Sequence, residues 1–325
     1  MKKWLAAVSA AVLLTSPLAA LADAYPDRAI TWIVPFSAGG PTDAMARNIA
    51  NAVSKQLKQT ILVENAPGAG GTIGATRVAR SKPDGYTFLV GHIGYMAAAP
   101  SLYPSLPYDP VRDFDAVFRF PDTPLVLLVG ANSPYRDVPS LIAYGKANPG
   151  KLNFSNAGVG STSHLVASLF ASQAGIEITP IAYKGAGPAL NDLMGGQVDA
   201  MFDQTNTALP QTRGDKVRAL GLTSAAGMPQ FPNVPAIGAK AIPGFQVATW
   251  YGLYAPKGTP PEMIQTLYAA YQKAMQDQAF TGQMSDQGIL LLAPEDYAPQ
   301  ALQQHTEAEG KRWATVVKQA GISLQ

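Results

Sequence analysis

The chain has 325 residues, no cysteine, three histidines, and 24 basic against 22 acidic residues. This length suits two α/β domains of about 150 residues each. The absence of cysteine excludes disulfides, iron–sulfur clusters, thiolate zinc sites and cysteine nucleophiles. Three histidines offer little for a metal site, so we expect neither a metal nor another cofactor.

The first 22 residues differ from the rest of the chain. Lys2 and Lys3 precede an apolar stretch over residues 4–14. Ala20 and Ala22 then place small residues on either side of Leu21, at the positions that a signal peptidase recognises. This pattern predicts a secretory signal peptide cleaved after Ala22, and hence an exported protein. The segment carries two lysines and no acid, so the mature chain has 22 basic against 22 acidic residues. We therefore expect no nucleic-acid partner, and no later segment is apolar enough to span a bilayer.

Short apolar strands alternate with amphipathic helices after the leader. In the first part of the chain, strands are predicted over 30–35, 61–64 and 87–91, and helices over 42–57 and 72–81. This βαβαβ order predicts a parallel sheet covered by helices on both faces, with ligands at the carboxyl ends of the strands.

A proline-punctuated stretch over 100–124 interrupts this order, and a second series follows. Its predicted strands cover 125–129, 152–155, 179–183, 200–202 and 217–222. Its predicted helices cover 140–148, a stretch from 163, and 188–195. Residues 250–254 are predicted to form a connecting strand, and two tail helices, over 260–275 and from 294 through 317, to pack on the first domain. The expected divisions are 23–122 for domain 1, 123–249 for domain 2, and 250–325 returning to domain 1.

The first strand ends in a glycine-rich loop that opens a helix. Glycines allow the backbone to approach a ligand, Pro41 presets the first helical turn, and the helix N-terminus favours a carboxylate or phosphate. The alternative is an ordinary turn in which Asp43 only complements the helix dipole. The candidate ligand-binding residues here are Phe36, Ser37, Ala38, Gly39, Gly40, Thr42 and Asp43.

A similar loop over 156–164 adds hydroxyl groups to the backbone donors. Its candidate ligand-binding residues are Gly158, Gly160, Ser161, Thr162 and Ser163. The hydroxyls could cap the following helix or donate to an anion. His164 beside these serines also permits a hydrolase interpretation, but the sequence lacks a Gly-x-Ser-x-Gly elbow.

Three further candidates stand at predicted strand ends: His92, Tyr183 and Asp203. His92 could line the cleft or be a packed or solvated neighbour. Tyr183 begins a third glycine-rich strand exit, and Asp203 could contact a ligand, cap a helix or form a salt bridge between domains. Phe36, Tyr95 and Tyr183 are candidate apolar walls that would suit an aromatic acid. The glycines over 67–74 resemble a dinucleotide-binding fingerprint only loosely, because Ile73 occupies the place of the third glycine.

These segments, in order along almost the whole mature chain, resemble the Bug family of exported solute receptors for tripartite tricarboxylate transporters. The matching stretches are Tyr25–Arg28, Ile33–Asp43 with Ala46 and Arg47, Val63–Asn65 with Gly68–Gly71, Lys82–Tyr86, Gly160–Ser161 with His164–Leu165, Tyr183–Gly185 with Pro188–Ala189, Gly196–Asp199, and Trp250–Gly252 with Ala255–Pro256 and Gly258–Pro260.

The resemblance implies a type II-like periplasmic-binding-protein fold, with two doubly wound α/β domains that close over a small carboxylate. It implies that main-chain groups of Ser37–Gly40, with Asp43, and of Gly158–Ser163 grip the ligand carboxylate. It also implies delivery of the ligand to membrane permease subunits. Many family members have a small hydroxyl residue where this sequence has His92, so that corner of the pocket is expected to differ.

The function that these observations favour is a non-catalytic, monomeric receptor for a di- or tricarboxylate, an amino acid or an aromatic acid. One alternative is an exported hydrolase that uses Ser161 or Ser163. The other is a ligand sensor that acts on a signalling partner, which would use the same liganded, closed state.

Overall fold

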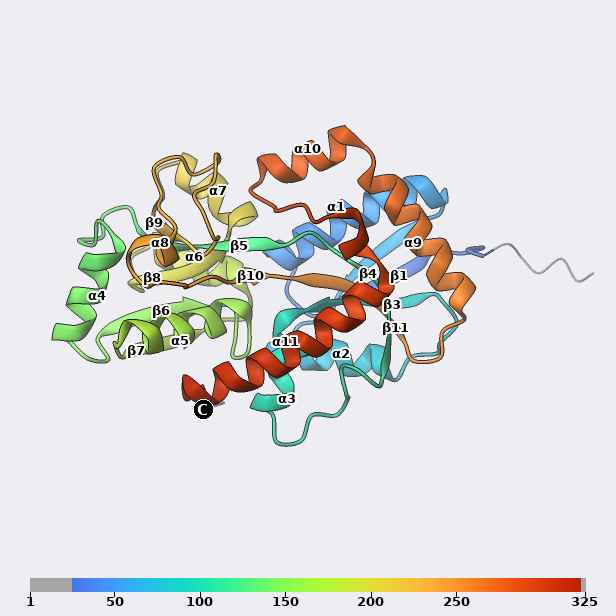
Figure 1. Cartoon of the computed structure of the whole chain (residues 1–325), viewed down its shortest axis with the longest axis horizontal. Helices are drawn as coiled ribbons and strands as arrows, with labels where there is room; N and C mark the ends of the chain where they lie inside the picture. Colours follow the sequence, from blue (N-terminus) through green and yellow to red (C-terminus); the bar gives the residue numbers. More distant parts are fainter. Residues whose placement is uncertain (1–24, 323–325) are drawn as a thin grey trace, which may run out of the picture.

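The computed structural model describes residues 25–322, and in this part of the chain two lobes lie side by side (Figure 1). The predicted signal peptide and its cleavage site after Ala22 lie outside the described residues. No helix within 25–322 has the length and apolar character needed to cross a membrane.

The first lobe is built on a five-stranded sheet with the order β2-β1-β3-β11-β4. Its strands are β1 (Ile30–Val34), β2 (Ile61–Asn65), β3 (Thr87–His92), β4 (Phe114–Arg119) and β11 (Tyr251–Pro256). Helices α1 (Pro41–Leu57), α2 (Thr72–Ala79) and α3 (Ala99–Leu102), with the short turns η1 (Ala69–Gly71) and η2 (Gly94–Ala98), follow the early strands. The apolar residues of β1, β3, β4 and β11 are largely buried, with Trp32 and Phe88 fully covered, whereas Leu62 of the edge strand β2 is exposed.

The second lobe is built on a six-stranded sheet in which β5 pairs with β8, β9 and β10, and β6 lies between β8 and β7. Its strands are β5 (Thr123–Gly130), β6 (Leu152–Asn156), β7 (Ile178–Ala182), β8 (Ala200–Gln204), β9 (Val217–Leu222) and β10 (Ala248–Thr249). Its helices are α4 (Val138–Ala147), α5 (Thr162–Ala174), α6 (Ala186–Met194), α7 (Thr205–Arg213) and α8 (Ile237–Lys240).

The parallel pairing predicted from the βαβαβ order is confirmed for the first three strands, but each complete sheet is mixed. The strands β1, β2 and β3 are parallel, but β11 runs antiparallel to β3 and β4. In the second sheet β5 runs antiparallel to β8 and β9. The antiparallel strands β5 and β11 are the first strands after the two points at which the chain crosses from one lobe to the other. Each is therefore reached from the other sheet and not through a crossover helix, which a parallel strand would need.

The proline-punctuated stretch also contains a strand, β4, that the sequence reading missed. Pro110 and Pro121 flank this strand, and Phe118 within it and Phe120 just beyond it are both buried. The helix predicted over 140–148 begins two residues earlier, at Val138, because Asp137 is its N-cap and forms a capping box with Ser140.

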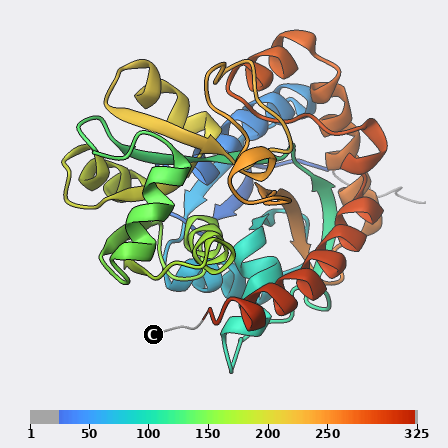
Figure 2. The same cartoon turned by 60° about the vertical axis from the view of Figure 1, so that its left-hand side comes forward.

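The C-terminal helices pack on the first lobe, as predicted (Figure 2). They are α9 (Pro261–Met275), α10 (Gln278–Asp286) and α11 (Pro299–Gln319), with the turn η3 (Pro294–Tyr297) before α11. Tyr271 of α9 stacks on Phe118 of β4, with ring centroids 4.0 Å apart. Helix α10 was not predicted from the sequence. Met284 is its one buried residue, so its sequence lacks the apolar periodicity by which a helix is identified.

Candidate functional site

A cavity between the lobes is lined at the N-termini of four helices. Gly40, Pro41 and Thr42 belong to the start of α1; Ser161, Thr162 and Ser163 to that of α5; Gly185 and Ala186 to that of α6; and Gln204 to that of α7. The helices have 17, 13, 9 and 9 residues, respectively. Unpaired backbone N–H groups and the positive ends of the helix dipoles therefore converge on one space.

The walls of this cavity carry almost no formal charge. Other side chains complete it, namely Phe36, Ser37, His92, Leu125, Ala157, Phe202 and Asp203. The space among the lining atoms measures about 420 Å³, including the part that opens to solvent. No Lys or Arg side chain lines it, so backbone dipoles are the groups that favour an anion there.

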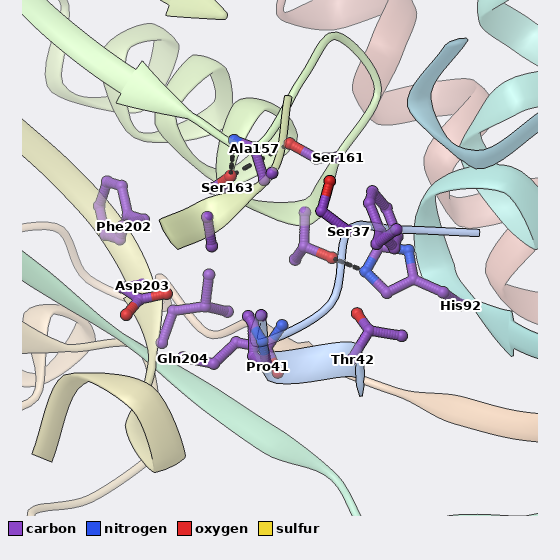
Figure 3. A pocket seen from close by; sticks show the side chains of 16 residues that line it. Ser37, Pro41, Thr42, His92, Ala157, Ser161, Ser163, Phe202, Asp203 and Gln204 are labelled. Atoms are coloured by element: carbon purple, nitrogen blue, oxygen red, sulfur yellow. Dashed lines mark hydrogen bonds between the residues drawn. The ribbon is translucent and has the colours of Figure 1, made fainter. Parts of the chain in front are cut away.

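Figure 3 shows residues of the two lobes on opposite sides of this cavity. Ser37, Thr42 and His92 come from the first lobe, and Ser161 and Asp203 come from the second. Among the residues proposed from the sequence, those that line the cavity are Phe36, Ser37, Gly40, Thr42, His92, Ser161, Thr162, Ser163 and Asp203. The sequence reading did not propose seven lining residues, namely Pro41, Leu125, Ala157, Gly185, Ala186, Phe202 and Gln204.

The other proposed residues, Ala38, Gly39, Asp43, Gly158, Gly160 and Tyr183, are not among those that line the cavity. Both carboxylate oxygens of Asp43 accept hydrogen bonds from donors of its own lobe. These donors are the Gly39 amide, at 2.9 Å, and the side chains of Arg47 and Asn65. Burial would raise the pKa of Asp43, but these three partners hold it below the usual value. Asp43 therefore fixes the loop that leads into α1.

Neither of the two tyrosines proposed as walls is among the lining residues. The Tyr183 hydroxyl donates to Asp192 Oδ2 at 2.6 Å. Tyr95 is fully buried and packs against Gly71 and the His92 ring. Of the proposed aromatic walls, only Phe36 lines the cavity.

His92 is a neutral hydrogen-bond donor. Its ring lies among Phe36, Tyr95 and Tyr251, and burial lowers the pKa of His92 to about 3. Its Nδ1 accepts from the Gly94 amide at 3.0 Å, so the proton of the neutral ring is on Nε2. Nε2 lies 2.7 Å from Thr162 Oγ1 and therefore donates to it. The Thr162 hydroxyl keeps its own proton for another acceptor.

The His92–Thr162 hydrogen bond joins the two lobes, and other contacts accompany it. The Ser37 hydroxyl donates to the Lys184 carbonyl at 2.7 Å, and the Tyr251 hydroxyl donates to Gln204 Oε1 at 2.5 Å. These residues flank the cavity, so the described conformation is one in which the lobes are closed on each other.

The serines of the α5 loop have structural partners. Ser161 is the N-cap of α5 and accepts from the His164 amide, and Ser163 Oγ accepts from the Ala157 amide at 2.9 Å. His164 Nδ1 accepts from the Gly160 amide at 3.2 Å. Within residues 25–322, neither serine hydroxyl is hydrogen-bonded to an imidazole, which is the arrangement that would activate a nucleophile.

The capping role of Ser161 makes a prediction. Ser161→Ala is expected to lower the free energy of unfolding by about 1 kcal/mol, because the first turn of α5 loses its side-chain acceptor. Urea denaturation of the ligand-free protein measures this, with Ser172→Ala, in the last turn of α5, as a control that is expected to change stability by less than about 0.5 kcal/mol. Equal stability of Ser161→Ala and the natural protein would contradict the capping role.

No group of three or more His, Cys, Asp or Glu residues in the described part of the chain is arranged to hold a metal ion. The chemistry that the cavity offers is hydrogen bonding and an electrostatic environment for a small anion.

Comparisons with known proteins agree with this geometry. Residues 45–322 match the model of the tripartite tricarboxylate transporter family receptor. The structure of the periplasmic binding protein BugD superposes with a TM-score of 0.88 at 38% identity, over 93% of this chain and 100% of that one.

Two further solved structures contain small carboxylates. MatC from Rhodopseudomonas palustris, with bound malate, has a TM-score of 0.86 at 40% identity and covers 90% of this chain and 100% of its own. Rpa4515 from R. palustris, with adipate, has a TM-score of 0.87 at 34% identity and covers 92% and 99%. The fold is therefore that of the periplasmic binding proteins, and the chain belongs to the tripartite tricarboxylate transporter receptor family, in which the Bug proteins are found.

Proposed function

We propose that this protein is a periplasmic, non-catalytic receptor that captures a small carboxylate between its lobes and delivers it to membrane permease subunits. The convergence of four helix N-termini on a cavity without Lys or Arg is the observation that carries the proposal. Malate and adipate in two structural relatives support a carboxylate as the solute.

Helix termini cannot supply all of the affinity. One partly buried terminus favours an anion by at most about 2 kcal/mol, so four at this limit only equal the net total of about 8 kcal/mol that micromolar binding needs, before the cost of association is met. Thr162, with a hydroxyl proton that His92 leaves free, can add a charge-assisted hydrogen bond. Phe36 and Phe202 add apolar walls, and bridging waters can complete the contacts.

We infer that the receptor works as a monomer whose two domains, 23–122 with 250–325 and 123–249, close over the ligand. The presence of two separate sheets supports this division, and the hydrogen bonds that join the lobes support their closure. A sensor role would use the same closed state. Uptake measured after deletion of the permease genes distinguishes transport from signalling, because only transport depends on the permease.

The proposal is tested by a thermal-shift screen of the mature protein against carboxylates and their neutral amides. A carboxylate at 100 times its Kd is expected to stabilise the folded state by about 2.7 kcal/mol, and so to raise the melting temperature by several degrees. The matched amide is expected to have no effect, and the carboxylate is expected to be recovered unchanged after long incubation. Consumption of the compound, or equal shifts with the amides, would contradict the proposal.

Thr162→Val is expected to weaken binding of the carboxylate found in that screen at least tenfold. The substitution keeps the shape of the side chain but removes the hydroxyl donor, and a hydrogen bond to a charged group contributes about 1.5–3 kcal/mol. Isothermal titration calorimetry measures the change. Thr179→Val is the matched control, because the Thr179 hydroxyl donates to the Gly150 carbonyl and is not among the residues that line the cavity. An unchanged Kd for Thr162→Val would exclude this contact.

A further inference from the structure

The cavity combines four positive helix ends with one buried acid. Its only side chains that could carry a charge are His92 and Asp203, and His92 is neutral. Asp203 is 2% exposed, at the carboxyl end of β8 and directly before the N-cap of α7. In Figure 3 Asp203 and Gln204 lie across the pocket from Ser37 and His92. An ionised acid at this place would repel a plain anion.

Asp203 has no cationic partner among the described residues. Its Oδ2 accepts from the Thr207 hydroxyl at 2.8 Å, and no ion pair is formed. The strands β5 and β6 beside β8 carry no ionisable side chain. The other elements that line the cavity carry His92 of β3, His164 of α5, Asp192 of α6, Arg213 of α7, and Asp43, Arg47 and Lys55 of α1. Arg47 pairs with Asp43, Lys184 before α6 is exposed, and the Tyr251 hydroxyl of β11 lies close enough to interact with Asp203. Arg213 is exposed at the far end of α7, about 15 Å along the helix.

The Asp203 carboxyl is nevertheless mostly ionised at neutral pH. Burial raises the pKa of Asp203 to about 6, although the Thr207 hydroxyl and the Gln204 backbone amide lower it. At neutral pH the empty cavity holds a carboxylate, and a second carboxylate that enters the same space is repelled by it. A ligand that brings a positive charge to Asp203 removes this repulsion and supplies the missing partner.

We propose that Asp203 pairs with an ammonium group of the ligand, so that the favoured solutes are carboxylates that also carry an amino group. This inference rests on the proposed function. The ligand carboxylate would then lie at the starts of α1, α5 and α6, and its ammonium at the acid that precedes α7. Malate and adipate carry no ammonium group, so the inference separates the ligand of this chain from those of the two relatives.

The test compares acids that differ only in an amino group. Three pairs are suitable: succinate with aspartate, glutarate with glutamate, and 3-phenylpropanoate with phenylalanine. Calorimetry at pH 7.5 gives Kd for each acid with the natural protein and with Asp203→Asn, which keeps the size of the side chain and an acceptor for Thr207. Asp192→Asn is the control, because it removes an acid of the second lobe that hydrogen-bonds Tyr183 and is not among the cavity residues.

In at least one pair, the amino member is expected to bind the natural protein at least tenfold more tightly. Asp203→Asn is expected to reduce that preference to less than threefold, and Asp192→Asn is expected to preserve it. Melting temperatures of the ligand-free variants report whether they fold.

Other outcomes overturn the inference in distinguishable ways. Equal binding within every pair that binds, or a preference that survives Asp203→Asn, overturns the ammonium site but leaves the carboxylate receptor intact. Tighter binding of the acid without the amino group, with uptake of one proton that Asp203→Asn abolishes, shows that Asp203 serves as a protonated donor, and it also overturns the ammonium site. Binding of none of the six acids overturns this inference, and the screen of carboxylates against amides then decides the proposed function separately.

Discussion

Gly94→Ala is expected to weaken ligand binding by tenfold to about a hundredfold without unfolding the protein. Gly94 begins η2 in the first lobe, and an added Cβ would overlap the carbonyl oxygen of Gly160 in the second lobe. That oxygen belongs to the backbone of the α5 loop, which is held by the Ser161 cap, so it cannot simply turn away. An overpacked contact of this kind costs about 1–3 kcal/mol, and only when the lobes are closed.

The backbone of Gly94 does not require glycine, because its φ lies outside the left-handed region. Within its own lobe the added carbon lies 3.1 Å from Nδ1 and 3.3 Å from Cε1 of His92, so the ring must shift by a few tenths of an ångström. The melting temperature of the ligand-free protein, in which the lobes are not held together by a ligand, is therefore expected to fall only slightly. Calorimetry gives the Kd, and small-angle X-ray scattering shows whether the ligand still compacts the molecule.

Gly187→Ala is the matched control. Gly187 lies in α6, beside the cavity wall, and an added Cβ meets no atom within 4 Å. Its Kd is expected to equal that of the natural protein. Closure and Kd unchanged in Gly94→Ala would mean that the bound state is more open than the described conformation.

Acidification is expected to destabilise the protein through His92. Because burial lowers the pKa of His92 from 6.5 to about 3, the unfolded chain binds a proton between these two pH values that the folded chain does not. Stability from His92 is therefore full above pH 6.5 and is lost as the pH falls toward 3. At 1.36 kcal/mol per pKa unit, this amounts to about 3 kcal/mol between pH 7 and pH 4.

His92→Gln is expected to remove this part of the pH dependence, because glutamine keeps a donor amide but does not titrate. Urea denaturation of the ligand-free protein at pH 7, 5 and 4 measures the difference between variant and natural protein. Burial also lowers the pKa of His164 and of His305, and raises that of Asp203, but these groups are present in both proteins and cancel. Identical pH profiles would show that the ring is hydrated in the ligand-free state.

The sequence predicted the parts of the site that depend on neighbouring residues. The loops over 36–43 and 156–164 were identified because glycines, hydroxyls and a following helix stand together in the chain, and both contribute to the cavity wall. Phe202 and Gln204 flank the predicted Asp203 but were not proposed. Phe202 resembles any core phenylalanine, and Gln204 becomes the N-cap of α7 only in a helix that the sequence reading did not predict.

By itself, the sequence determined the α/β rhythm, the glycine-rich strand ends and the family. These features depend on backbone preference and apolar periodicity within a few residues. Only the tertiary structure decided that β5 and β11 run against their neighbours, that His92 meets Thr162 across 70 positions of chain, and that Asp203 faces helix ends without a cation. Those features arise from the two chain crossings and from closure of the lobes, which bring together residues whose local sequences carry no information about each other.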